Sequence, residues 1–445
     1  MREATVDSNK NNHNHNNHQP TEVAATARLP CDSDVIVIGG GLVGAATGVA
    51  LSRRAAATSC TIYEQAGALK TVGAAIGLYP NGLSALEYIS PSVLKVVRKN
   101  ASPCLVFERR DASTDEVVRT TSVPGLNETA PVMYAWFLLQ KHLSEALPEG
   151  CLQLGHTFRS YEVLDDGRVS VCLIDQSNQQ LVTRTCRLLI GADGIHSGVR
   201  RQLLGKAPTV RYYGKVMYRA VLDRNGMESV LEIPEGSQIS WQGTEIGKSF
   251  SIRETTEGIL TVTAAALAAD PEPRDNAGDT TTTNTTTTNA TTTTTTTHKQ
   301  RLVKLFSTFP PTVRTIIDRL PEDLLHEDFL RDVHVPSESD WFDGPVVLVG
   351  DAVHAMTPGM GQGANQGLED VCELVEAVAR GRPLCDYVRA RIDRVTSIRE
   401  RSAENTRQSN TYTKETASTP FRRRKYSTDF KQELYEWKPV LETMP

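Results

Sequence analysis

The sequence predicts an α/β fold with two lobes, one built around a βαβ unit and the other around a mostly antiparallel sheet. Three observations lead to this expectation. Within residues 34–64 an apolar run, a glycine-rich turn, a helical pattern and a second apolar run follow one another, which is the order of a βαβ unit. Residues 208–265 alternate apolar and polar side chains, as half-buried antiparallel strands do. The 445 residues can also bury enough core for more than one lobe.

Composition and charge exclude several classes of protein. A hydrophobic share of 39% and a charged share of 23% are ordinary for a soluble protein, and the net charge of −5 offers no basic surface for nucleic acid. No window approaches the roughly 18 consecutive apolar residues of a membrane-spanning helix, and the chain does not begin with an apolar signal segment. The eight cysteines form no CxxC pair. We therefore expect a cytoplasmic or other reducing intracellular setting.

The chain is expected to leave its first lobe and return to it. We predict a disordered Asn- and His-rich tail (1–30), the first part of the first lobe (31–205), the second lobe (206–335), the second part of the first lobe (336–400) and a polar tail (401–445). The Thr-rich stretch 275–298 has no alternating apolar face, so we expect a disordered insertion in a surface loop of the second lobe. The histidines of the N-terminal tract are expected to be incidental to its low complexity, not metal ligands.

The first glycine-rich turn has the pattern of a dinucleotide-binding loop. Gly39, Gly41 and Gly44 follow the apolar run 34–38 with the spacing GxGxxG. The first glycine permits a tight turn, the second lets the backbone approach a pyrophosphate, and the third lets helix and strand pack closely. Glu64 ends the next predicted strand and can accept hydrogen bonds from a ribose. This context predicts a bound dinucleotide, either FAD or NAD(P).

A second loop, GADGIHS at 191–197, follows the predicted strand 188–190. Its Asp193 lies between small residues at a strand end, where the backbone can approach a phosphate or a ribose. The pattern is equally typical of a tight turn in which Asp193 accepts hydrogen bonds from its own backbone. The residues themselves leave both interpretations open.

A third loop, 350–370, contains five glycines and lies between a predicted strand and a helical pattern. Asp351 at the strand end can bind a ribose or ribityl hydroxyl. Residues 361–365 bring free N–H groups and the positive end of a helix dipole toward a ligand. His354 is either catalytic or, as we expect, a structural histidine that bridges the loop. The loop indicates an anionic or electron-rich cofactor.

Together, the three loops resemble those of the group A flavoprotein monooxygenases, the family of para-hydroxybenzoate hydroxylase, salicylate hydroxylase and FAD-dependent urate hydroxylase. The matching segments are GGGLVG with Glu64, GAAIGLYPNG at 73–82, GADGIHSGVR at 191–200 and GDAVHAMTPGMGQGANQGLEDV at 350–371. The resemblance covers about residues 34–400. It implies an FAD-binding Rossmann-type (glutathione-reductase-like) domain with a second, mostly antiparallel substrate domain.

The resemblance also implies the reaction. In this family NAD(P)H, a transient co-substrate, reduces the bound FAD, O₂ forms a flavin hydroperoxide, and its terminal oxygen is transferred to the substrate. We therefore expect an FAD-dependent NAD(P)H monooxygenase, an oxidoreductase that hydroxylates or epoxidises an electron-rich aromatic or isoprenoid small molecule. Two alternatives stay open: an FAD-binding protein of this fold without hydroxylase activity, and an FAD-dependent reductase.

The same resemblance implies which residues bind FAD. Gly39, Gly41, Gly44 and Glu64 would hold the adenosine and pyrophosphate, Asp351 the ribityl chain, and Pro358 with residues 361–365 the isoalloxazine. The full implied set is Gly39, Gly41, Leu42, Val43, Gly44, Glu64, Gln65, Lys70, Ala75, Gln140, Asp193, Gly350, Asp351, Pro358, Gly361, Gln362, Gly363, Ala364 and Asn365.

Two of these positions depart from the family pattern. Gln140 stands where an arginine is common, so it offers a phosphate a hydrogen bond but no charge. Lys70 stands where an arginine is often found, and it provides a point charge without a fork of donors. In the second lobe, Arg219 matches a strand that lines the active site in related hydroxylases. It either pairs with an anionic substrate or forms a salt bridge at the surface of its strand.

Overall fold

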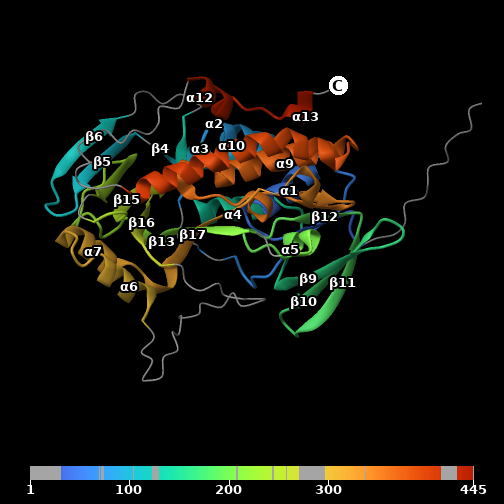
Figure 1. The fold of residues 1–445 in the computed structure, drawn as a ribbon, viewed down its shortest axis with the longest axis horizontal. Helices are drawn as coiled ribbons and strands as arrows, with labels where there is room; N and C mark the ends of the chain where they lie inside the picture. Colours follow the sequence, from blue (N-terminus) through green and yellow to red (C-terminus); the bar gives the residue numbers. More distant parts are fainter. Residues whose placement is uncertain are drawn as a thin grey trace, which may run out of the picture.

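The computed structural model describes residues 32–69, 71, 75–103, 105–122, 130–206, 209–242, 245–256, 258–269, 296–335, 337–411 and 428–443. The expected N-terminal tail, most of the Thr-rich stretch and Lys70 lie outside these residues. Within the described part of the chain, no helix is both long enough and apolar enough to span a membrane. Figure 1 shows the two lobes, with α6 and α7 of the second lobe at the left and the first lobe at the right.

The first lobe is built on a mostly parallel sheet with the strand order β18-β19-β12-β1-β2-β8, which confirms the predicted α/β class. Its strands are β1 (Val35–Ile38), β2 (Cys60–Glu64), β8 (Leu152–Leu154), β12 (Leu188–Gly191), β18 (Phe342–Asp343) and β19 (Val346–Leu348). The strands β19, β12 and β1 are neighbours that run parallel, and each one precedes a glycine-rich loop. Because carboxyl ends of parallel strands meet at one edge, the three loops converge there.

The central strands β1 and β19 are fully buried apolar runs, as in parallel sheets that are covered on both faces. α1 connects β1 to β2 and packs against α9, while α9 packs in turn against α2 and α10. The helices of this lobe are α1 (Leu42–Arg54), α2 (Pro80–Ile89), α3 (Pro91–Asn100), α4 (Trp136–Glu145), α5 (Gly198–Leu204), α8 (Asp351–His354), α9 (Gly363–Ala379) and α10 (Leu384–Asn410). Three short 3-10 turns also occur at Glu322–Leu324, Glu338–Asp340 and Pro358–Met360.

Two small antiparallel sheets extend the first lobe. A meander of β9 (His156–Val163), β10 (Val169–Asp175) and β11 (Gln180–Cys186) projects from it at the lower right of Figure 1. The second small sheet joins β3 (Ala75–Leu78), β4 (Ser102–Pro103) and β7 (Val132–Ala135). This sheet lies next to the second lobe, because the Ala135 N–H donates a hydrogen bond to Thr256 Oγ1 at 3.1 Å.

The second lobe is a sheet with the order β17-β13-β16-β15-β14-β5-β6, antiparallel except where β14 meets β5. Its strands are β5 (Val106–Asp111), β6 (Val117–Ser122), β13 (Val210–Asp223), β14 (Ser237–Gln242), β15 (Ser249–Thr256), β16 (Ile259–Leu267) and β17 (His326–Val333). Two of them, β5 and β6, come from the segment that we expected to belong entirely to the first lobe. One face is apolar and packs against α6 (His298–Leu305) and α7 (Pro311–Arg319).

The C-terminal segment differs from the expected polar tail. α10 continues past residue 400 to Asn410, and two further helices follow, α12 (Thr428–Tyr435) and α13 (Val440–Thr443). The side chains of Phe430, Leu434, Trp437 and Leu441 are buried. Phe430 and Leu434 are four residues apart in α12 and so lie on one face of that helix, whereas Trp437 follows α12 and Leu441 lies in α13.

Candidate cofactor site and active site

The GxGxxG loop contains glycines that serve two different purposes. Gly39 has a φ of +106°, and a Cβ added there would lie 2.4 Å from the carbonyl oxygen of Ala192. A Cβ added at Gly44 would lie 1.9 Å from the carbonyl oxygen of Gly39. These two glycines are therefore needed for the packing of the protein itself. Gly41 is different, because no atom of the described part of the chain lies within 4 Å of an added Cβ.

Gly41 is also the N-cap residue of α1, and no side chain caps this helix end. The first N–H groups of α1 therefore lack a side-chain partner and sit beside the open space at Gly41. Leu42 and Val43 begin the helix at this point, with Leu42 buried in the core. A helix N-terminus with free N–H groups next to open space is an arrangement that accepts a pyrophosphate.

Two side chains fix the peptide groups on either side of the Gly40 α-carbon. Glu64 accepts a hydrogen bond from the Gly40 N–H at 2.7 Å, and its other oxygen accepts one from the Ala66 N–H at 2.8 Å. Gln140 on α4 is buried and donates from Nε2 to the Gly40 carbonyl at 2.9 Å. The neutral donor at position 140 thus binds the backbone of the loop. Gln65, next to Glu64, is exposed.

Asp193 forms the tight turn that was one of the two interpretations of its loop. Its Oδ2 accepts hydrogen bonds from the Gly198 N–H at 2.7 Å and the Val199 N–H at 3.2 Å, at the start of α5. Its Oδ1 is buried and has no hydrogen-bond partner among the residues that the structure describes. Burial outweighs the hydrogen bonds and raises the pKa of Asp193. The turn therefore leaves one carboxylate oxygen beside Gly39 available to a ligand.

His354 has a structural position, as expected. It is fully buried, and its Nε2 lies 2.5 Å from Asp370 Oδ2, which also accepts the Gly350 N–H at 2.8 Å. His354 and Gly350 are thus bridged through Asp370 on α9. Burial alone would raise the pKa of Asp370, but His354 and Arg391 outweigh it and hold the pKa below its usual value. Asp351, by contrast, is exposed at the start of α8.

The loop before α9 is tied to β3 by a single asparagine. Asn365 accepts the Tyr79 N–H at 3.0 Å and donates to the carbonyl groups of Gly77 at 2.9 Å and Gly361 at 3.0 Å. The buried Gln362 accepts a hydrogen bond from Asn81 at 2.9 Å. The side chains at positions 362 and 365 are therefore engaged within the protein. α9 has no side-chain cap, so what this segment can offer a ligand is its backbone N–H groups.

The remaining predicted residues differ in accessibility around this edge. Pro358 and Gly361 are exposed, whereas Ala75, Gly363 and Ala364 are half-buried. A Cβ added at Gly363 would meet no atom closer than 3.7 Å. The backbone at the start of α9 is thus approachable, like that at Gly41.

The sequence did not reveal the charged cluster beneath this loop. Arg391 on α10 is fully buried and pairs with Glu369 and with Asp370, the latter at 2.8 Å from its Nε. Arg394 pairs with Glu369 at 2.7 Å. A signal was present, since Glu369 and Asp370 interrupt an otherwise apolar helical pattern. Buried carboxylates of this kind need charged partners, but the sequence does not say which arginine provides them.

Arg219 forms the salt bridge that was one of its two interpretations. Its Nε lies 3.1 Å from Asp328 Oδ2 on β17, and its side chain is one third exposed. It belongs to the inner face of the seven-stranded sheet, which we define as the face opposite α6 and α7. This face points toward the first lobe, because Met217 on it packs with Ala403 of α10.

The inner face carries a polar row that sequence analysis did not identify. Neighbouring strands place Arg109, Ser240, Ser251, Thr263, Arg219 and His326 side by side in register. All six are half-buried. Each of the six lies on a different strand, and the strands extend over residues 106–333, so no local sequence motif contains them.

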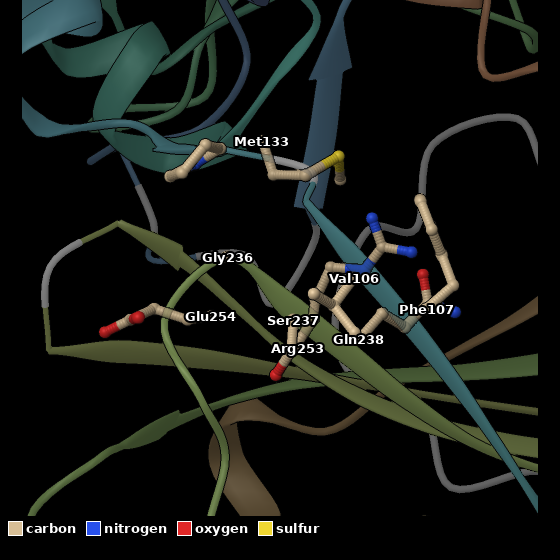
Figure 2. A pocket seen from close by; sticks show the side chains of 9 residues that line it. Val106, Phe107, Met133, Gly236, Ser237, Gln238, Arg253 and Glu254 are labelled. Carbon is tan, nitrogen blue, oxygen red and sulfur yellow. The ribbon is translucent and has the colours of Figure 1, made fainter. Parts of the chain in front are cut away.

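A small cavity, with room for about one water molecule, opens between this face and β7. Figure 2 shows Met133 on one side of the cavity and Ser237 and Gln238 on the other. The Oε1 atom of Gln238 is buried and has no hydrogen-bond partner among the described residues. An unpaired acceptor of this kind can bind a water molecule.

The residues present fit FAD. The open space at Gly41 and the uncapped α1 suit its pyrophosphate, the free Oδ1 of Asp193 suits a hydroxyl, and the uncapped α9 suits an electron-rich ring. These groups lie at one edge of one sheet, on loops that follow adjacent parallel strands.

Comparison with known proteins agrees with this fit. The sequence model of the FAD binding domain family matches residues 32–304 and 327–407. The chain is 25% identical over 382 residues to 3-amino-4-hydroxybenzoate 2-monooxygenase PtmB3 of Streptomyces platensis, covering 83% of this chain and 87% of that protein. It is 28% identical over 354 residues to salicylate hydroxylase of Pseudomonas putida, covering 75% and 74%.

A solved structure shares the fold. The Klebsiella pneumoniae protein HpxO, in complex with FAD and uric acid, superposes with a TM-score of 0.68 at 23% sequence identity. The alignment covers 91% of this chain and 93% of HpxO. An FAD-dependent urate hydroxylase of the same species is 26% identical over 375 residues, covering 82% of this chain and 87% of that protein.

Proposed function

The chain belongs to the FAD binding domain family and is an FAD-dependent monooxygenase, and we propose that its substrate is a small electron-rich aromatic molecule with polar substituents. The observation that supports this best is the position of the polar row on the inner face. Its hydroxyl and charged groups face the lobe whose three glycine loops fit FAD. Salicylate, urate and aminohydroxybenzoate, the compounds in the relatives' names, are also small polar aromatics.

Each part of the site has a separate role in this proposal. The N–H groups at the start of α1 bind the pyrophosphate, and Glu64 together with Asp193 accepts hydroxyl groups of the cofactor. Asp351 binds the ribityl chain. The N–H groups at 361–365 stabilise negative charge on the reduced ring, because they lie at the positive end of α9. When bound and reduced by NAD(P)H, FAD supplies the chemistry that activates O₂.

On the substrate side, Arg219 orients a ring that carries an acidic or polarised group. Its guanidinium is partly satisfied by Asp328, which fixes its direction, while one third of the side chain remains exposed. An arginine held in this way presents a planar fork of donors to a carboxylate or an enolate oxygen.

The experiment is a turnover assay of the purified, FAD-loaded protein with NADH and with NADPH. Hydroxybenzoates, aminohydroxybenzoates and urate are added one at a time while NAD(P)H oxidation and O₂ consumption are recorded. We expect at least one aromatic acid to stimulate both, with a product heavier by one oxygen atom. If FAD binds but every compound in the panel leaves oxidation at its basal rate, the substrate proposal is refuted. Reduction of an added compound without gain of oxygen would favour the reductase alternative.

A further inference from the structure

The C-terminal segment 428–443 docks on the loop that leads into α9. Phe430 and Leu434 of α12 form a buried cluster with Ile398 of α10, and Met356 and Met360 of that loop pack against the same cluster. The sequence model of the family matches up to residue 407, so this segment lies beyond the residues that the model matches.

Two charged side chains hold this segment by its backbone. Arg394 donates to two carbonyl groups in the last turn of α12, both at 2.9 Å, while its guanidinium pairs with Glu369 of α9. The buried Glu373, also on α9, accepts the first two N–H groups of α13 at 2.7 and 3.0 Å. The helix that offers its N-terminus to the flavin ring thus also anchors the covering segment.

One aromatic contact connects the docked C-terminal segment to a residue that packs against the loop. The rings of Tyr435 and Tyr79 are stacked, with centroids 5.8 Å apart and planes only 3° from parallel. The Tyr79 ring lies against Gly361 and Gly77, since a Cβ added at either glycine would come 3.2 Å from it. The N–H of Tyr79 is bound by Asn365. Tyr79 is therefore held between Tyr435 and the flavin-ring loop.

We propose that Tyr435 is a positioning residue for the flavin ring, acting through Tyr79 on the backbone of residues 361–365. This inference rests on the FAD site proposed above. Stacking by Tyr435 restrains Tyr79, the Tyr79 ring restrains Gly361, and Gly361 precedes the N–H groups at the start of α9. Without Tyr435 the loop keeps its hydrogen bonds to Asn365 but loses the ring that holds it from outside.

The test compares three substitutions at one position in the full-length protein. Tyr435→Ala removes the ring, Tyr435→Leu keeps apolar bulk without a ring, and Tyr435→Phe keeps the stacking. The FAD dissociation constant, measured by flavin fluorescence, is expected to rise roughly 2- to 10-fold in the Ala and Leu variants, the range expected for an aromatic pair. The dissociation constant of the Phe variant is expected to equal that of the wild type. Lys438→Ala, an exposed substitution in the same segment, is the matched control.

Amide hydrogen exchange supplies a readout that needs no bound cofactor. In the protein without FAD, residues 358–365 are expected to exchange faster in Tyr435→Ala and Tyr435→Leu than in Tyr435→Phe. Wild-type exchange and wild-type FAD affinity in both ring-less variants would overturn the proposal. An equal loss of FAD affinity in Tyr435→Phe would also overturn it, because the effect would then come from the hydroxyl group and not from the stacked ring.

Turnover separates this inference from the substrate proposal. If an aromatic substrate is found, the ring-less variants are expected to release a larger share of the consumed O₂ as hydrogen peroxide. If the wild-type protein hydroxylates nothing, the substrate proposal fails, while the affinity and exchange measurements still decide the role of Tyr435.

Discussion

The loop edge of the first lobe and the inner face of the second lobe are built in opposite ways. At the loop edge, the groups that face a ligand are mainly backbone N–H groups, while side chains such as Asn365 and Asp370 bind the protein. On the inner face, the groups that we propose to face the substrate are side chains, because the backbone groups are engaged in strand pairing. Substitutions of the buried side chains at the edge should therefore disturb folding and cofactor binding together, whereas substitutions on the inner face should disturb substrate binding alone.

The largest effect is expected from Arg391→Met, which tests how far the loop edge depends on its buried charges. The substitution leaves Glu369 and Asp370 in the core with fewer cationic partners. Removing one partner of a buried ion pair costs about 3–5 kcal/mol, so the free energy of unfolding in urea should fall by this amount.

The neighbouring Arg389→Met serves as the control for this experiment. Arg389 pairs with Glu338, but both side chains are exposed. Its loss should change the free energy of unfolding by no more than about 1 kcal/mol. Equal effects of the two substitutions would show that the buried cluster does not stabilise the edge.

A pair of alanine substitutions separates the two kinds of glycine within the first loop. Gly44→Ala places a Cβ against a backbone carbonyl and should destabilise the fold by about 1–3 kcal/mol or more. Gly41→Ala meets open space at an ordinary φ of −67°, so the melting temperature of the protein without FAD should stay within a few degrees of wild type.

The FAD affinity of the Gly41→Ala variant then becomes informative. A methyl group in the space reserved for the pyrophosphate should weaken FAD binding by roughly tenfold or more, as for a loss of about 1.4 kcal/mol. Unchanged FAD affinity with unchanged stability would mean that the pyrophosphate lies elsewhere, and the proposed use of α1 would be abandoned.

On the inner face, Arg219→Met should impair substrate binding while leaving the stability and the FAD affinity close to those of the wild type. The ion pair with Asp328 is one third exposed on the arginine side, so its loss should cost little stability. We expect FAD affinity to be unchanged and the KM for an acidic aromatic substrate to rise about tenfold, since hydrogen bonds to charged groups contribute about 1.5–3 kcal/mol.

Asp328→Asn is the companion variant, because it releases Arg219 without removing it. Its KM should change less than that of Arg219→Met. A KM that is the same in Arg219→Met and in wild type would leave Arg219 as a salt-bridge residue of its strand and nothing more.

The contrast between the two regions also explains what the sequence could predict. The loop edge is encoded locally: Gly39 and Gly350 follow their strands within two residues, and parallel pairing brings the strand ends together. The polar row is encoded by register, because Ser251 meets Thr263 only through the alignment of two strands. Register depends on packing across the whole sheet, which a single sequence does not display.

Two further features were not predicted from the sequence, for different physical reasons. Arg391 lies in a helix that is polar overall, so its burial depends on the neighbouring helix and not on its own pattern. The C-terminal segment did carry a signal, the apolar residues Phe430, Leu434, Trp437 and Leu441, but they are isolated among polar and charged residues and are divided between two short helices and the turn that joins them. Whether a side chain is buried, and where a segment docks, depends on two elements that pack together. The sequence of one element therefore does not determine either.

The smallest effect concerns acidification of the loop edge. His354 and Arg391 hold the pKa of Asp370 below its usual value, despite burial. A depressed pKa in the folded state means that the stabilisation is present above the unfolded pKa of about 3.9 and is lost as the pH falls through the folded value. The free energy of unfolding of the wild type should therefore decline on acidification below about pH 4.

Asp370→Asn should be less stable than the wild type at neutral pH, but its decline over this range should be shallower because position 370 no longer titrates. Urea unfolding at a series of pH values between neutral and acidic measures both slopes. If the free energy of unfolding falls equally steeply with pH in the wild type and in Asp370→Asn, other carboxylates cause the acid sensitivity. The inner face should take no part in this difference, since its Arg219–Asp328 pair is partly exposed and screened by solvent. If Asp370→Asn makes the decline of stability with falling pH shallower and Asp328→Asn does not, the acid-sensitive charge lies at the loop edge, where the same residues serve the cofactor site and the core.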